Sequence, residues 1–294
     1  MGEIMDNLLS GLGKFGLDEN MTSNIFADEG VNAKKVTNAE GQQVTADPTE
    51  EDFLLKKSIR CPVCDGTLRT LMVKSGRAKR LEPDMDLRPK FQYIDTNKYD
   101  VASCPHCGYT ALHRYWPHLS TLQMKLINEG IRSKFKATPV EEKEEIVQWT
   151  YDEAIEKYKL ALYTTLVKKG PTSEKAYECL KIAWLCRGKA EMLAAEDKEK
   201  NKEAILATKK EEATFYKQAF EGFVKAMSSE NYPMCGMDQN TVDLLIAAMA
   251  FNLGQYDYAS RFVSNLIVSR TATGNIKNRA QDLKEKILAK KNEE

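Results

Sequence analysis

Apolar residues recur every three to five positions through the second half of the chain, and this spacing predicts amphipathic helices. The first apolar stripe consists of Val147, Tyr151, Ala154, Tyr158, Ala161 and Leu166. The stretch TPVE, residues 138–141, offers an N-cap threonine, a proline at the first helical position and a glutamate that can satisfy free N–H groups of the first turn. We therefore expect a long helix to begin there and to end at Gly170 and Pro171.

The same periodicity predicts five further helices, at about residues 173–195, 203–228, 239–253, 256–270 and 276–290. Three segments share a register in which an aromatic residue precedes an alanine and a second aromatic follows: Tyr151–Leu162, Phe215–Met227 and Gly254–Ile267. They resemble the second helix of tetratricopeptide repeats, although a full period of about 34 residues is not maintained. A plain helical bundle is the alternative. In both cases we expect the tyrosines to be packing residues.

Residues 51–120 have a different character. Short stretches that favour strands, Thr67–Lys74 and Lys98–Cys104, are separated by Gly76 and by prolines at 83 and 89. This pattern predicts a small antiparallel unit. It contains few large apolar residues, so something other than a hydrophobic core must stabilise it.

The first 50 residues are rich in glycine, asparagine, aspartate and threonine, and we expect most of them to be disordered. An apolar cluster, Leu8, Leu9, Leu12, Phe15 and Leu17, is either part of a flexible tail or a short docking segment. The predicted fold class is α+β, mostly α. Its parts are an acidic tail (1–50), a zinc-ribbon-like β module (51–120) and a tetratricopeptide-like helical domain (121–294).

Charge is balanced overall but unevenly distributed. The 43 basic and 43 acidic residues cancel, whereas residues 1–50 hold 3 basic and 9 acidic residues and residues 51–120 hold 12 and 8. This balance argues against a surface that binds nucleic acid or membrane as a whole. One local patch remains, residues 56–80, with eight basic residues and a single acid, Asp65.

Phosphate is one possible ligand of that basic patch. Its candidate contact residues are Arg69, Lys74, Arg77, Lys79 and Arg80. The alternative is a solvated pair of strands whose basic residues form salt bridges with Asp84 and Asp86.

The longest apolar run, Leu244–Phe251, has eight residues, far fewer than the ~18 needed to span a membrane. The N-terminus also lacks the pattern of a signal peptide. We therefore predict a cytoplasmic protein without a membrane segment. In a reducing compartment, a C-x-x-C pair is typical of metal binding or redox chemistry.

Four of the seven cysteines form two such pairs, CPVC at Cys61 and Cys64 and CPHC at Cys104 and Cys107, with 39 residues between the pairs. Two C-x-x-C turns brought together make a tetrahedral site of four thiolates, which suits Zn²⁺. Because four protein ligands leave no open position, we predict one structural zinc ion per chain. A dithiol redox site and an iron–sulfur cluster are the alternatives.

The other candidate residues favour packing. Cys179, Cys186 and Cys235 are expected to be buried apolar residues, and His113 and His118, on either side of Trp116, to be surface or packing residues. The sequence has no glycine-rich phosphate loop, no H-E-x-x-H motif and no nucleophile elbow. We therefore expect no enzymatic activity.

Several motifs in order resemble one bacterial family. CPVC, RLEPDMDLRPKFQY, NKYDVASCPHCGYTA and KIAWLCR, from about residue 55 to 270, are similar to the family catalogued as domain of unknown function 2225. The resemblance implies a two-knuckle cysteine module joined to tetratricopeptide-like helices, with the four paired cysteines as metal ligands. The sequence departs from the usual knuckle at Asp65, where a glycine normally follows the second cysteine.

These observations favour a non-enzymatic zinc-binding adaptor whose helical domain binds a protein or peptide partner. The first alternative is a nucleic-acid-binding zinc module that uses residues 56–80. The second is a sensor in which oxidation of the thiolates releases zinc.

Overall fold

The computed structural model describes residues 35–37, 43–45, 47–137 and 146–293. The chain divides into two compact units, Met1–Pro48 and Thr49–Glu294. In the first unit, strand β1 (Lys35–Thr37) pairs antiparallel with β2 (Gln43–Thr45). The apolar cluster Leu8–Leu17, and the disorder expected for most of the tail, fall outside the described residues.

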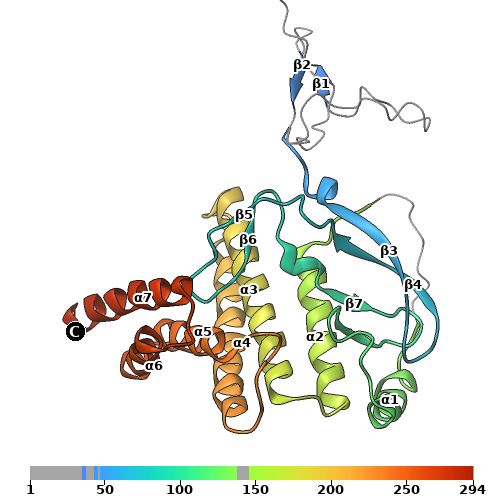
Figure 1. Ribbon diagram of the computed structural model, residues 1–294. Helices are drawn as coiled ribbons and strands as arrows, with labels where there is room; N and C mark the ends of the chain where they lie inside the picture. Colours follow the sequence, from blue (N-terminus) through green and yellow to red (C-terminus); the bar gives the residue numbers. More distant parts are fainter. Residues whose placement is uncertain (1–34, 38–42, 46, 138–145, 294) are drawn as a thin grey trace, which may run out of the picture. The chain divides into compact units, whose positions relative to one another are not determined.

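The N-terminal part of the second unit consists of small antiparallel strand pairs (Figure 1). The longest is a hairpin of β3 (Leu54–Arg60) and β4 (Thr67–Val73), in which Leu54 pairs with Val73 and Arg60 with Thr67. Two shorter pairs follow: β5 (Arg80–Leu81) with β6 (Lys90–Phe91), and β7 (Val101–Ser103) with β8 (Thr110–Leu112). The 3₁₀ turns η2 (Glu50–Phe53) and η3 (Thr96–Tyr99) precede β3 and β7.

Helices form the rest of the unit. They are α1 (Thr121–Ile127) with a π-helical turn, η4 (Asn128–Arg132), then α2 (Tyr151–Val167), α3 (Thr172–Asp197), α4 (Lys202–Met227), α5 (Gln239–Asn252), α6 (Tyr256–Val268) and α7 (Gly274–Glu293). The five helices predicted after residue 170 are confirmed, with ends within a few residues of those expected. The fold is mostly helical, with small antiparallel strand pairs near the N-terminus, as predicted.

The predicted start of the first long helix is wrong. Residues 138–145 lie outside the described residues, but Ile146–Thr150 is not helical, and α2 begins at Tyr151. A second capping box decides this, because the Thr150 hydroxyl accepts from the Glu153 N–H while the Glu153 carboxylate accepts from the Thr150 N–H. Val147, expected in the apolar stripe, is exposed instead.

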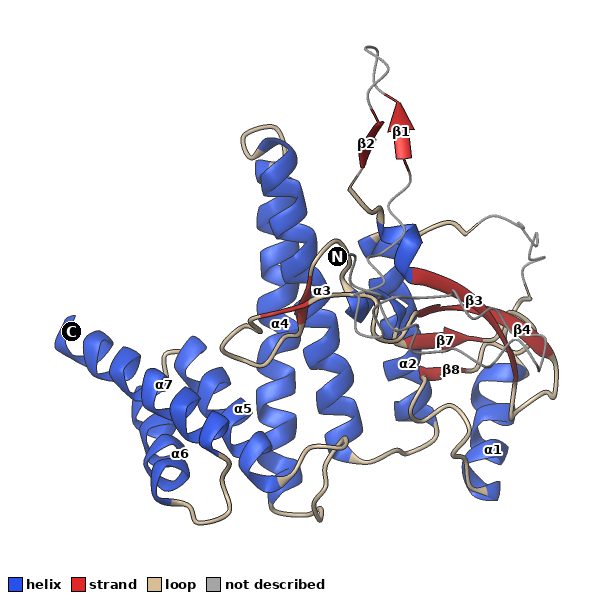
Figure 2. Ribbon diagram, turned by 45° about the horizontal axis from the view of Figure 1, so that its top comes forward, coloured by secondary structure: helices blue, strands red, loops and turns tan. Residues whose placement is uncertain are grey.

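The elements lie in a row. Within the second unit, Figures 1 and 2 both show the β3–β4 and β7–β8 hairpins on the side of α2, then the long pair α3 and α4, and then α5, α6 and α7. From α2 to α7, each helix packs against the next one in the chain, and β7 and β8 pack against α2. The largest apolar core lies among α3 to α7, and a second core lies among α2, α3 and the β7–β8 hairpin.

The expected packing residues are in these cores. Tyr158 of α2 and Tyr216 of α4 are buried, and the three cysteines of the helical part, Cys179, Cys186 and Cys235, are buried as well. The predictions that these tyrosines and cysteines pack in the interior are confirmed.

Asn97 in η3 joins the β hairpins to two helices. Its backbone carbonyl accepts a hydrogen bond of 2.9 Å from the Tyr158 hydroxyl, and its side-chain oxygen accepts one of 3.0 Å from Lys181 of α3. Both donors are buried, so these bonds satisfy polar groups that water cannot reach. The hairpins and the helices therefore share a polar as well as an apolar interface.

The loop Glu82–Lys90, which we call the bridging loop, reaches three helices. Arg88 is buried and donates to both carboxylate oxygens of Glu191 in α3, at 2.7 and 2.8 Å. Arg279 of α7 donates at 2.7 Å to the carbonyl of Asp84. Asp86, also buried, pairs with Arg187 of α3 at 2.9 Å, and Arg187 in turn pairs with Glu212 of α4.

Candidate metal centre

Each C-x-x-C motif is the loop of a β hairpin. Cys61 follows β3 directly. The turn that begins at Cys61, which we call the first knuckle, leads through Gly66 into β4. Cys104 follows β7, and the turn that begins there, which we call the second knuckle, leads through Tyr109 into β8. Antiparallel pairing brings the two ends of each knuckle together, so both cysteines of a pair point to the same side of a tight turn.

The two knuckles repeat the same backbone hydrogen bonds. In the first, the Asp65 N–H donates to the Cys61 carbonyl at 2.9 Å, and the Cys61 N–H donates to Gly66 at 2.9 Å. In the second, the Gly108 N–H donates to the Cys104 carbonyl at 3.0 Å, and the Cys104 N–H donates to Tyr109 at 2.8 Å. The loops are therefore equivalent residue by residue.

Asp65 occupies the position that Gly108 has in the second knuckle. Both residues have a left-handed backbone, with φ of 66° for Asp65 and 75° for Gly108. Aspartate is one of the few non-glycine residues that tolerate this region. The sequence departure at Asp65 therefore leaves the knuckle geometry intact.

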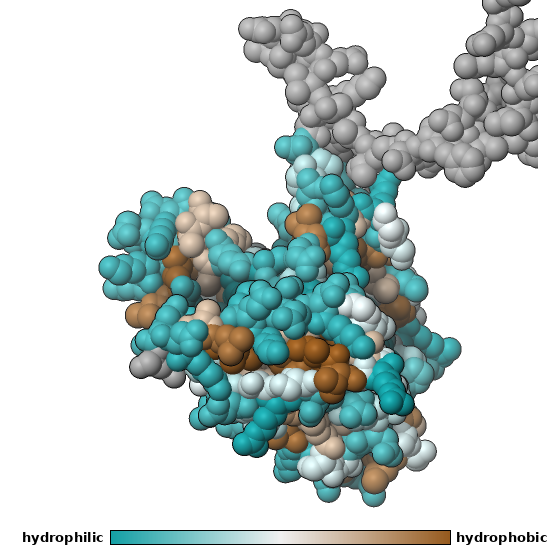
Figure 3. Space-filling model, turned by 60° about the vertical axis from the view of Figure 1, so that its left-hand side comes forward, coloured by the Kyte–Doolittle hydropathy of each residue, from teal (hydrophilic) through white to brown (hydrophobic). Residues whose placement is uncertain are grey.

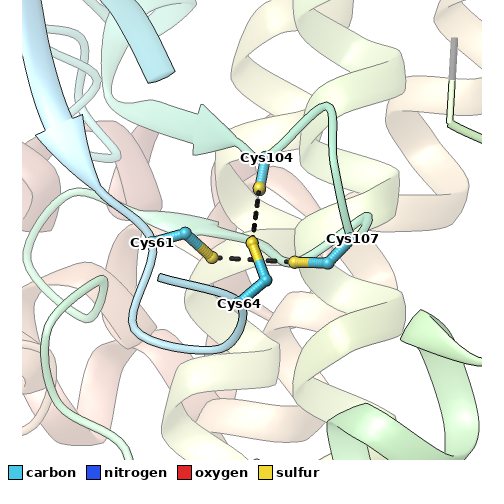
Figure 4. Close-up of side chains that lie close together, drawn as sticks. All are labelled: Cys61, Cys64, Cys104 and Cys107. Carbon is cyan, nitrogen blue, oxygen red and sulfur yellow. Dashed lines mark hydrogen bonds between the residues drawn. The ribbon is translucent and has the colours of Figure 1, made fainter. Parts of the chain in front are cut away.

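The four cysteine sulfurs converge on one point (Figure 4). All four lie within 4.8 Å of one another. The closest contacts cross from one knuckle to the other, 3.6 Å between Cys61 and Cys107 and 3.6 Å between Cys64 and Cys104. A tetrahedral ion with bonds of ~2.3 Å to sulfur needs sulfurs about 3.8 Å apart, so the arrangement has the size of a metal site.

The site is enclosed on most sides. Cys61, Cys104 and Cys107 are 0% exposed, and Cys64 is half-buried. Trp116 covers the first knuckle, because its indole N–H donates at 2.9 Å to the Arg60 carbonyl.

Tyr109 links the second knuckle to the same tryptophan. Its hydroxyl donates at 3.1 Å to the Trp116 carbonyl, and the two rings lie 4.8 Å apart between centroids. Ile127 of α1 and Ile131 of η4 complete the apolar shell around the cysteines. A shell of this kind limits the access of water and of competing ligands.

The sulfurs influence one another electrostatically. Hydrogen bonds from Cys107 and then Cys61 lower the pKa of the Cys104 thiol to about 2. The contact with Cys104 raises the pKa of Cys107 and raises that of Cys61 to about 12. Ionisation of the Cys104 thiol is thus favoured, and the negative charge of its thiolate opposes ionisation of the thiols of Cys61 and Cys107. A cation at the centre would remove this opposition, since thiolates are the form that binds metal.

These four residues can hold a metal ion with a complete tetrahedral set of soft donors. Among residues 47–137 and 146–293, no other group of three or more histidine, cysteine or acidic side chains comes close enough together to do so. The nearby His106 does not belong to this group, and its Nε2 lies 3.3 Å from the Thr67 carbonyl. The predicted ligand set is therefore brought together as expected.

A family comparison decides the classification. The model of a family described as "Uncharacterized protein conserved in bacteria (DUF2225)" matches residues 54–287. The chain belongs to this family. The match begins at the first residue of β3 and ends within α7, so the family domain includes both the cysteine hairpins and the helices. Searches of curated proteins and of solved structures found no match.

The histidines near the second knuckle have different surroundings. His113 is partly buried, and burial lowers its pKa, whereas His118 is exposed. The expectation that they are packing and surface residues agrees with these positions. In the described part of the chain, no helix has the length and apolar content to cross a membrane.

The candidate phosphate residues follow one another along β4, the next turn and β5. Arg69, Arg77, Lys79 and Arg80 are exposed, while Lys74 is half-buried and donates at 3.0 Å to the Asp52 carbonyl.

The expected salt bridges from this patch to Asp84 and Asp86 are wrong. Asp84 pairs with Arg88, Lys90 and Arg187, and Asp86 pairs with Arg187. The bridging loop turns both carboxylates toward α3, away from the basic strands.

Sequence reasoning missed a buried polar cluster between α2 and α3. Lys168 and Glu174 form an ion pair of 2.6 Å in which both side chains are at most 5% exposed. Glu178 is 0% exposed, and burial raises the pKa of its carboxyl group to about 8. Charged residues on a helix normally indicate a solvated face, so the sequence pattern carries no signal for this cluster.

Proposed function

We propose that the protein is a non-enzymatic adaptor in which the cysteine hairpins hold one structural Zn²⁺ ion and the helices bind a segment of another protein. The closed set of four sulfurs carries this proposal. An ion with four thiolate ligands has no position left for water or substrate, so it stabilises the fold and performs no catalysis.

Two features of the site support a structural Zn²⁺ ion. All four donors are soft sulfur atoms at distances suited to a tetrahedral ion. The surrounding hairpins are short, with strands of two to seven residues, and metal binding supplies folding free energy to such small units.

The helical part offers the binding surface in this proposal. Three of its segments are similar to tetratricopeptide repeats, whose stacked helices commonly bind peptides. Figure 3 shows a band of hydrophobic residues, bordered by hydrophilic ones. The band lies on the side of the molecule where Figure 1 places α6 and α7. A band of this kind is typical of an interaction site.

A second feature of the helical part is a groove along α3 and α4, which we call the α3–α4 groove. It consists of two adjoining hollows of about 380 and 550 Å³. Both are lined by Arg187, Lys209 and Glu212. The first extends along the two helices to the turn between them, and the second reaches the bridging loop and the turn at Leu253.

The test is a comparative pull-down with the full-length protein. The groove variant replaces Ala194 and Ile205, which line the first hollow, with arginine and aspartate, and the control replaces exposed residues Ser264 and Asn265 of α6 in the same way. We expect one protein to be recovered with the wild type and the control but lost with the groove variant. Equal recovery with all three would refute the proposed binding site.

The exposed residues Arg77, Lys79 and Arg80 favour a nucleic-acid-binding module as the second candidate. No ion pair holds these three side chains within the described chain, and they follow one another closely in sequence. Binding of RNA or DNA through them would weaken steeply with salt and would be lost on reversal of the three charges. Unchanged binding after the reversal would exclude this candidate.

A further inference from the structure

The four sulfurs of the metal centre differ in their access to solvent. Cys61, Cys104 and Cys107 are 0% exposed, whereas Cys64 is half-buried. A thiolate reacts with a reagent in solution only where that reagent can reach the sulfur atom. Cys64 is therefore the sulfur that a small oxidant reaches first.

Gly66 leaves one side of the Cys64 sulfur uncovered. A Cβ atom at position 66 would lie 3.4 Å from this sulfur, so any side chain there would stand against it. The same point lies 2.9 Å from the ring of His106, whose side chain is exposed. The φ of Gly66 is not positive, so its backbone conformation does not require glycine. The missing side chain therefore opens a path to Cys64.

The sulfur in contact with Cys64 belongs to the other knuckle (Figure 4). The sulfurs of Cys64 and Cys104 are 3.6 Å apart, and a disulfide needs about 2.05 Å, so a shift of about 1.6 Å would allow a bond. Such a bond joins the β3–β4 hairpin to the β7–β8 hairpin. A bond inside either knuckle would leave the two hairpins without a covalent link.

We propose that Cys64 is the site at which hydroperoxides oxidise the metal centre, and that the product is a Cys64–Cys104 disulfide. The disulfide replaces the ion as the link between the two hairpins, so the metal leaves while the hairpins stay joined. This inference rests on the metal-binding part of the proposed function and adds a form of regulation to it.

The reaction with hydrogen peroxide proceeds in two steps. The Cys64 sulfur attacks one peroxide oxygen, the O–O bond breaks, a sulfenic acid forms on Cys64, and the departing hydroxide takes a proton to become water. The Cys104 thiolate then attacks the Cys64 sulfur, the S–S bond forms, and the S–O bond breaks to release a second hydroxide, which also becomes water. Two thiolates lose two electrons, and the peroxide gains them.

The disulfide removes two of the four metal ligands. Thiolates bind zinc, and the sulfurs of a disulfide carry no charge to do so. Cys61 and Cys107 alone do not make the tetrahedral set that a structural zinc ion requires. Oxidation at Cys64 therefore releases the metal, and reduction of the disulfide restores the site.

The experiment treats the full-length, zinc-loaded protein with hydrogen peroxide. A chromogenic chelator records zinc release, and mass spectrometry of peptides with blocked thiols identifies the disulfide. We expect one zinc ion per chain to be released, a Cys64–Cys104 linkage to form, and the buried cysteines of the helical part to stay reduced. Dithiothreitol followed by zinc should restore the metal content.

A glycine variant tests the path to Cys64. Gly66→Ala places a methyl group against the sulfur and should slow zinc release by peroxide at least ~3-fold. Gly274→Ala is the matched control, because no atom lies within 4 Å of its added Cβ, and its rate should equal that of the wild type. Native mass spectrometry before oxidation checks that both variants hold the metal.

Pulse labelling of the zinc-loaded wild type with iodoacetamide gives a second measurement that does not depend on a variant. Among the four ligands, Cys64 should take up the label first. Equal labelling of all four cysteines, or an unchanged rate of zinc release in Gly66→Ala, would refute Cys64 as the site of attack.

The remaining outcomes separate this inference from the proposed function. Disulfides inside the knuckles, or a sulfinic acid on Cys64 without a disulfide, would refute the crossed product. Zinc that stays bound at peroxide concentrations that oxidise free thiols would refute the inference and leave the structural ion in place. Untreated protein without zinc would refute the metal-binding part of the proposed function itself.

Discussion

Thr165 and Glu178 are joined by a buried hydrogen bond of 2.9 Å between α2 and α3. The same hydroxyl lies 3.3 Å from Oε1 of Glu174. A hydroxyl has one proton to donate, so it cannot satisfy two ionised carboxylates at once. A proton on Glu178 resolves this conflict, because Glu178 can then donate to Thr165 while Thr165 donates to Glu174. The raised pKa of Glu178, about 8, agrees with this assignment.

Glu178→Gln should change how stability depends on pH. The pKa of Glu178 is raised from 4.5 to about 8 on folding, chiefly by burial. Its contribution to stability is therefore fully present below about pH 4.5 and is lost as the pH rises toward about 8. Glutamine does not titrate, so the variant should gain stability relative to the wild type from pH 5 to 8, by at least ~1.4 kcal/mol.

Urea unfolding at pH 5 and pH 8 measures this difference. Glu199→Gln, which removes an exposed carboxylate from the turn between α3 and α4, is the control. A difference between Glu178→Gln and the wild type that is the same at both pH values would show that Glu178 is ionised in the folded protein.

Replacement of one knuckle cysteine should remove the metal. Native mass spectrometry of the wild type should show one ion per chain, and Cys61→Ser should show none. Because folding of small metal modules is linked to about 10–16 kcal/mol of metal-binding free energy, the variant should lose about 3 kcal/mol or more of stability. Cys179→Ala, in the helical core, should keep the metal. Full metal content in Cys61→Ser would mean that the sulfurs do not act as one ligand set.

The two left-handed knuckle positions should respond differently to alanine. Asp65→Gly should be tolerated, while Asp65→Ala should be less stable than Asp65→Gly by about 1 kcal/mol, because alanine lacks the freedom of glycine at positive φ. Gly108→Ala should cost more, since its Cβ would lie 2.5 Å from the Phe135 ring. Thermal unfolding of the metal-bound variants ranks them, and equal effects at Asp65 and Gly108 would contradict the geometry.

Replacements of Arg187 and of Asp86 should have strongly non-additive effects on the free energy of unfolding. The Asp86 side chain is 0% exposed, so Arg187→Met leaves a buried carboxylate without its cation and should cost about 3–5 kcal/mol. Asp86→Asn should cost less, because asparagine carries no charge. The double variant should be more stable than the sum of the two effects predicts, by at least ~1 kcal/mol in a double-mutant cycle of urea unfolding. Additive effects would show that the pair does not interact.

The sequence predicted best where local pattern determines structure. The helices from α3 to α7 have apolar spacing within the segment itself, and α5 also has a side-chain cap from Asp238, so their positions could be predicted to within a few residues. The convergence of the four paired cysteines could also be predicted, because a C-x-x-C turn is specified by four consecutive residues. The boundary at residue 120 and the tetratricopeptide-like repeat remain predictions.

The predictions from sequence failed where contacts between residues far apart in the chain determine the local structure. The TPVE stretch favoured a helix from residue 138, but Trp149 stacks on Tyr99 at 5.3 Å, and its carbonyl accepts from Lys98. These long-range contacts hold the segment before Tyr151 outside the helix. The pairing of Asp86 with Arg187 could not be predicted either, because Arg187 lies 101 positions further along the chain.

The bridging loop has a consequence for biosynthesis. Its partner Glu191 lies 103 residues beyond Arg88, and Arg279 lies 197 residues beyond Glu82. At about 5–20 residues per second, a ribosome adds 197 residues in ~10–40 s. Arg88 and Asp86 remain exposed to water for about half of that interval, until their partners in α3 have been made. The nascent chain therefore completes its internal ion pairs only as the last helix leaves the exit tunnel, and earlier arrest would leave this charged segment accessible to proteases and chaperones.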